Sequence, residues 1–205
     1  YLLFYNALGK GQLSVASPVQ SSWVIITVIL SVLFLGEHLS ILQAALIFMI
    51  IAGILLVSFR YIELDILDLQ LLPGMKENII SAVFWGVNWV IIGYMVSQYS
   101  WFIPIFMLRL FSVIFLFAYA PLSKKPIEIP RTKLIAVIAV LDAMAFAAWG
   151  IGVTSEFVSV VSPVAAAFPL VAVLLGRVFL KEELAKNQIV GVLLIVVGVV
   201  ALATI

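Results

Sequence analysis

The sequence predicts an all-α polytopic membrane protein, built as an inverted repeat of five-helix units with seven full spans and a partial one. Composition, the length of the apolar runs and an internal repeat lead to this fold class. Of the 205 residues, 65% are hydrophobic and 10% are charged, and the mean hydropathy is +1.30. Soluble domains carry about 25% charged residues. This deficit, with a net charge of +1, excludes a soluble enzyme, a disordered segment and a nucleic-acid binder.

Apolar runs set the expected spans. A helix crosses a bilayer core about 30 Å thick with roughly 20 apolar residues. Runs of this length predict seven spans, at 14–35, 41–59, 78–97, 102–121, 133–153, 157–180 and 187–205. The apolar stretch 1–8 is too short to cross, so we expect it to be the end of a span that starts upstream. The chain is therefore expected to be truncated at its N-terminus.

Two segments of the chain repeat each other. Residues 14–57 align with 159–202 without a gap, and they share Ser-Pro-Val, Glu, Gln and Gly at matched positions. A polar framework in fixed register indicates a true repeat. The second copy has three spans ahead of the matched pair, which predicts ten spans in the intact protein. The expected domains are the C-terminal part of a first repeat (1–59), a cytoplasmic linker (60–77) and a complete second repeat (78–205).

Positive charges orient the spans. Lys and Arg outside the spans gather around residue 10 and in 60–77, 122–133 and 181–186, whereas the loops at 36–40, 98–101 and 154–157 have none. Cytoplasmic loops are enriched in Lys and Arg. We therefore expect a multi-pass protein of the cell (plasma) membrane with an extracytoplasmic C-terminus. Five spans per repeat place the two copies in opposite orientation.

The repeated pattern resembles a known family. It contains Ser17-Pro18-Val19, an apolar run, Phe34-Leu35-Gly36-Glu37-His38 and Gln43, and the second copy repeats the pattern from Ser162-Pro163-Val164 onward. It resembles the drug/metabolite transporter (DMT) superfamily, in its EamA-type ten-helix branch. Trp85-Gly86-Val87-Asn88-Trp89 resembles the Trp-Gly-x-Asn stretch of that family, and Arg109 its Arg in the second helix of a repeat. The resemblance implies a carrier of small metabolites that works by alternating access, and it does not fix the substrate.

Arg109 and Asp142 are ionisable residues placed within predicted spans, where an unpaired charge costs several kcal/mol. Their depths in neighbouring spans differ by about 6 Å. Asp142 could bind a cationic group or a proton, and Arg109 a carboxylate or phosphate. The alternative is an ion pair that joins two helices and never touches substrate.

Further substrate-binding candidates are polar and aromatic. Trp85, Asn88 and Trp89 share a helical stripe that could hydrogen-bond a substrate and wall it by apolar or cation–π contact; alternatively, they pack helices together. Ser17, Gln20 and Ser162 supply polar groups near helix ends. Pro18, Pro163 and Pro169 could kink helices and form gates, since interrupted helices in inverted repeats point to transporter sites. Pro18 and Pro163 could instead simply lie near helix N-termini.

Acidic residues between spans have a different expected role. Glu37 and Glu182 each precede a span, where we expect them to cap the helix that follows. The chain has no Cys and one His, and it has no nucleophile or phosphate-loop motif. We therefore expect a protein that is not an enzyme and that binds neither a metal ion nor a cofactor.

The sequence favours a secondary carrier that moves a small metabolite, such as an amino acid or a related polar or amphipathic compound. Its expected partners are this substrate, the lipid bilayer and a proton or other ion gradient, with no nucleic acid. The alternative is a non-transporting, truncated membrane subunit that completes its bundle with a partner chain.

Overall fold

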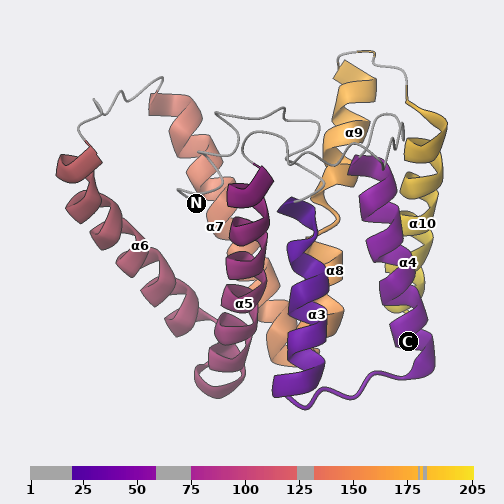
Figure 1. The fold of residues 1–205 in the computed structure, drawn as a ribbon, viewed down its shortest axis with the longest axis horizontal. Helices are drawn as coiled ribbons and strands as arrows, with labels where there is room; N and C mark the ends of the chain where they lie inside the picture. The colour runs from indigo at the N-terminus through magenta and orange to yellow at the C-terminus, as the bar shows by residue number, and fades with distance from the viewer. Residues whose placement is uncertain (1–19, 59–74, 124–131, 180, 182–183) are drawn as a thin grey trace. The chain divides into compact units, whose positions relative to one another are not determined.

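The computed structural model describes residues 20–58, 75–123, 132–179, 181 and 184–205, and within these ranges it contains helices and no strand (Figure 1). The helices are α3 (Trp23–Phe34), α4 (Ile41–Ser58), α5 (Met75–Tyr99), α6 (Phe102–Ser123), α7 (Thr132–Ser155), α8 (Val158–Ala165), α9 (Phe168–Phe179) and α10 (Lys186–Leu202). Five segments are long and apolar enough to cross a membrane. Four of them lie within α4, α5, α6 and α7, and the fifth (158–175) runs from α8 into α9; α3 and α10 are shorter apolar helices. The chain is thus an all-α polytopic membrane protein, as predicted.

The helix bounds follow the apolar runs closely. The predicted spans 41–59, 78–97, 102–121, 133–153 and 187–205 each correspond to one helix with ends within three residues of the prediction. The start of the span 14–35 lies outside the described residues, which begin at Gln20, and α3 begins at Trp23. The partial span 1–8 and the linker 60–77 up to residue 74 also lie outside them.

The predicted span 157–180 is the exception, because it forms two helices and not one. Residues 166–167 interrupt it, and the N–H of Leu170 donates to the carbonyl of Ala167 at 3.0 Å, three residues back. Pro169 has no backbone N–H, so the Ala165 carbonyl cannot receive its helical bond. The residues at the break are Ala, so apolarity continues through it and a hydropathy reading cannot detect it.

The chain divides into two compact units, which are described separately. The first unit holds the described residues up to Val90 together with 158–205, and the second holds 91–157. Helix α5 therefore contributes its first part to one unit and its end to the other. The second unit contains α6 and α7, which approach closely where a Cβ on Gly150 would meet the Ile105 side chain at 2.5 Å.

In the first unit, α4 and α10 lie side by side and run antiparallel (Figure 1). A Cβ on Gly53 would lie 2.8 Å from Cγ1 of Ile195, and a Cβ on Gly198 would lie 2.6 Å from Cγ1 of Ile50. The repeat offset of 145 turns the first of these contacts into the second. Each contact therefore occurs twice with the helices exchanged, as a twofold axis between two elements requires. These two helices are related as members of an inverted repeat.

Helix α3 packs against both α5 and α8 in the first unit. The Thr27 hydroxyl donates to the Gly86 carbonyl at 3.2 Å, and a Cβ on Gly86 would lie 2.7 Å from Cβ of Ile26. Small residues let membrane helices approach this closely. The crossing brings the aromatic residues of α3 and α5 together.

Candidate functional site

Three tryptophans from α3 and α5 form a cluster in the first unit. The rings of Trp23 and Trp89 stack with their centroids 5.5 Å apart, and Trp85 lies 6.5 Å from Trp23 and 6.4 Å from Trp89. Trp23 and Trp89 are 4% and 7% exposed. The structure thus brings Trp85 and Trp89 together, and it adds Trp23, which the sequence analysis missed. Trp23 lies three residues after Gln20, which is the spacing of side chains on one face of a helix, and this spacing could have identified it as a candidate.

Buried polar groups lie one turn before these tryptophans. Gln20 precedes Trp23 and Ser81 precedes Trp85, and α3 and α5 run in the same direction (Figure 1). Both amide atoms of Gln20 and the hydroxyls of Ser21 and Ser81 are buried and have no hydrogen-bond partner among the described residues. A buried polar group without a partner costs about 1–3 kcal/mol. A ligand that offered hydrogen bonds here would recover this energy.

The other predicted residues of the first unit that the structure describes lie in α5, α8 and α9. Asn88 is half-buried in α5 between Trp85 and Trp89. Ser162 is fully buried in α8, and its hydroxyl has no partner within the described ranges. Pro163 lies inside α8, and Pro169 lies in the first turn of α9, directly after the break. The predicted Ser17 and Pro18 lie outside the described residues.

Arg109 of α6 and Asp142 of α7 meet in the second unit. Nη2 of Arg109 donates to Oδ2 of Asp142 in an ion pair, and the guanidinium carbon lies 3.9 Å from the centroid of the Phe146 ring. The two charged side chains are 34% and 45% exposed. Phe146 was missed by the sequence analysis, although its place four residues after Asp142 puts it on the same face. Across the described ranges, no group of three or more acidic, His or Cys side chains could hold a metal ion.

Glu37 caps a helix, but not the one that was expected. Its carboxylate accepts hydrogen bonds from the backbone N–H groups of Val158, at 2.7 Å, and Ser159, at 2.9 Å, at the start of α8. The helix that follows, α4, is capped by Ser40 and Gln43, which exchange side-chain to backbone bonds of 3.0 and 3.1 Å. The expectation that Glu37 caps the next helix was therefore wrong. Glu182 lies outside the described residues.

The EamA-like transporter family model matches residues 1–59 and 74–204. The chain belongs to this family. The resemblance inferred from the sequence is thereby confirmed.

Two further proteins are similar to this chain. A Methanocaldococcus jannaschii protein described as uncharacterized is 49% identical over 57 residues, which cover 28% of this chain and 42% of that protein. A protein of known crystal structure matches 99% of this chain and 71% of its own, with a TM-score of 0.71 and 23% identity. At that identity the second likeness supports the fold alone. Family membership makes the EamA chain an integral multi-pass membrane protein, and the stretch that it shares with the M. jannaschii protein spans less than half of that protein's length.

Proposed function

We propose that this EamA-family protein is a secondary carrier that moves a small polar or amphipathic metabolite, such as an amino acid, by alternating access. The observation that carries the proposal is the buried Gln20 amide, which has no partner among the described residues and lies three residues before Trp23, whose ring stacks on that of Trp89. A site with an apolar aromatic wall and a few polar groups suits an amphipathic small molecule.

The polar groups and the tryptophan rings of this site would bind different parts of an amino acid. The amide of Gln20 can donate to a carboxylate and accept from an ammonium group, and the hydroxyls of Ser21 and Ser81 can do either. The Trp85 and Trp89 rings would contact the side chain or, by cation–π interaction, the ammonium group. The interrupted helix formed by α8 and α9 supports this proposal, since transporters bind and gate at such helices.

The Arg109–Asp142 pair would add charge recognition or coupling. Asp142 would take up a proton or a cationic group, and Arg109 would meet a carboxylate or phosphate. Their partial exposure supports this role, because a charge that faces hydrocarbon is costly and such pairs commonly line a ligand or water path. We further propose that the basic loops are cytoplasmic and that the C-terminus is extracytoplasmic, with a proton, another ion or the substrate gradient as the driving force.

Intrinsic fluorescence tests the proposal directly. The full chain, with Trp101→Phe and Trp149→Phe to leave the three clustered tryptophans, would be reconstituted in vesicles and titrated with each of the twenty amino acids. We expect at least one to shift the tryptophan emission and, as a radiolabelled compound, to accumulate in the vesicles. Gln20→Leu should weaken both effects, whereas the control Gln98→Leu, at the exposed end of α5, should not.

A negative result would also be informative. If no amino acid shifted the emission or entered the vesicles, the amino-acid carrier would be refuted. Recovery of uptake only on co-reconstitution with a second membrane chain would favour the alternative, a subunit that completes its bundle with a partner.

A further inference from the structure

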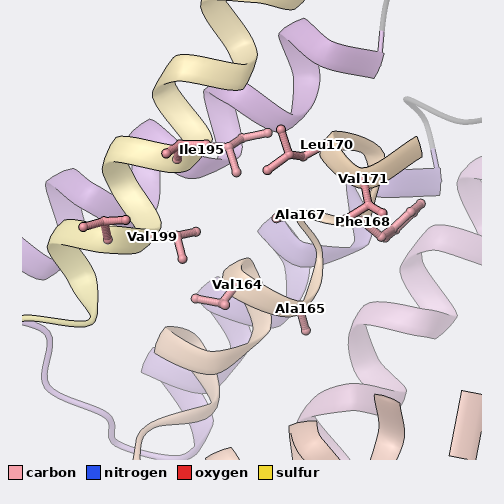
Figure 2. A pocket seen from close by; sticks show the side chains of 10 residues that line it. Val164, Ala165, Ala167, Phe168, Leu170, Val171, Ile195 and Val199 are labelled. Atoms are coloured by element: carbon pink, nitrogen blue, oxygen red, sulfur yellow. The ribbon is translucent and has the colours of Figure 1, made fainter. Parts of the chain in front are cut away.

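An apolar groove opens beside the break between α8 and α9 in the first unit (Figure 2). It has a volume of about 440 Å³ and is lined by α8, α9 and α10. All ten lining side chains are apolar, and the central ones in Figure 2 are Val164, Leu170, Ile195 and Val199. None of the tryptophans or polar side chains of the proposed substrate site belongs to it, so the groove is separate from that site.

The break itself creates the groove. Where α8 ends and α9 begins, the lining residues Ala165 and Ala167 have small side chains that leave the space beside α10 unfilled. Ile195 of α10, which is fully buried, forms part of the wall. Unfilled space in a protein loses the packing contacts that a neighbouring group would supply. An apolar group lying in this groove would restore those contacts.

The groove is open toward the outside of the helices. Phe168, Val171 and Val200 line it and are 51%, 55% and 60% exposed. In an integral membrane protein, the medium around such exposed apolar helices is lipid hydrocarbon. A polar substrate would find no hydrogen-bonding side chain in this lining. The lining and the surroundings together select a hydrocarbon chain.

Basic residues lie at the end where α9 finishes and α10 starts. Arg177 is seven residues beyond Leu170, about 10 Å along α9 and on the same face. Lys186 begins α10, nine residues or about 14 Å before Ile195. Lys181 lies between the two helices and is exposed. With Glu182 and Glu183 in the same segment, three positive and two negative charges leave +1, which complements a singly charged phosphodiester.

We propose that the groove holds one acyl chain of a membrane phospholipid, with its phosphate beside Arg177, Lys181 and Lys186. The acyl chain enters between α9 and α10 and ends against Val164 and Val199. The lipid thereby fills the space at the one interruption within the α8–α9 segment, and it is a bound component distinct from the transported metabolite.

Photo-crosslinking of the full chain in vesicles tests this inference. Phosphatidylcholine vesicles would be doped with a phosphatidylglycerol that carries a diazirine midway along one acyl chain, and adducts would be mapped by mass spectrometry. We expect adducts in 164–171 and 195–200 to exceed those on the exposed α6 residues Phe111, Phe115 and Phe117. Removal of Lys181 or Lys186 by Ser substitution should weaken the groove adducts by about fivefold each.

Groove-filling variants provide the second measurement. Val164→Phe and Val199→Phe should suppress the groove adducts, whereas Val197→Phe, which changes a 55% exposed residue of α10 outside the groove, should leave them unchanged. Adducts on α6 report in the same sample that the protein is folded and embedded. If the adduct density were equal in the groove and on α6, or if neither groove-filling variant lowered the groove adducts, the contact would be an ordinary one with bulk lipid and the proposal would be overturned.

Discussion

Replacing Glu37 should release the start of α8 and leave α4 intact. The Glu37 side chain is 7% exposed, and its carboxylate receives the N–H groups of Val158 and Ser159, which are themselves 3% and 0% exposed. A hydrogen bond to a charged group contributes about 1.5–3 kcal/mol. Glu37→Gln keeps one acceptor oxygen and should lose about 2 kcal/mol, and Glu37→Ala loses both bonds and should cost about 3–5 kcal/mol.

Amide hydrogen exchange measures this loss where it occurs. A loss of about 2 kcal/mol corresponds to roughly thirtyfold faster exchange in the first turn of α8. Exchange at the start of α4 should not change, because Ser40 and Gln43 cap that helix without Glu37. The control Glu156→Gln, at an exposed position after α7, should alter neither. Faster exchange in α4 with an unchanged α8 would show that Glu37 caps its own neighbour and that the reasoning is wrong.

Three other predictions concern the Arg109–Asp142 pair, the glycine contact of α4 with α10, and the orientation of the chain in the membrane. Asp142→Asn should impair flux at normal expression, measured in vesicles; if it and Arg109→Gln each misfold and the double variant recovers expression, the pair is structural. Gly191→Leu should lower thermal stability by at least about 1–3 kcal/mol of overpacking, seen as a lower melting temperature in detergent, since a Cβ there already lies 2.7 Å from the Gly53 carbonyl oxygen. His38→Cys should react with an impermeant maleimide on intact cells and Lys186→Cys should not; the reverse pattern would contradict the proposed orientation.

The sequence was sufficient to predict the helices where a single physical rule decides. Apolar length fixed α4, α6 and α7 to within two residues. The depths of Arg109 and Asp142 in the membrane could be calculated from the sequence, because the rise per residue along a helix is constant, and these depths placed the two side chains within reach of each other. These features depend on local composition and regular geometry alone.

Features that depend on distant partners could not be predicted in the same way. Glu37 and Val158 are 121 residues apart, and a carboxylate at a helix start looks the same whichever helix it caps. The break after Ala165 leaves hydropathy unchanged, and Pro169 alone hinted at it. The contact of Trp23 with Trp89 required knowledge of how α3 crosses α5, which is set by the close approach at Gly86.

The glycine contacts between α4 and α10 can form only after a delay during synthesis, because α4 is made well before α10. Ile195 follows Gly53 by 142 residues (195 − 53), so at about 5–20 residues per second it leaves the ribosome roughly 7–28 s later. Until then α4, with a mean hydropathy of 2.6, is apolar enough to rest in the bilayer while its glycine face stays uncovered. At high expression, the α10 of a neighbouring nascent chain can reach that face first. Crowding in the membrane during biogenesis would therefore favour contacts between α4 and α10 of different chains, and slow production would favour the contact within one chain.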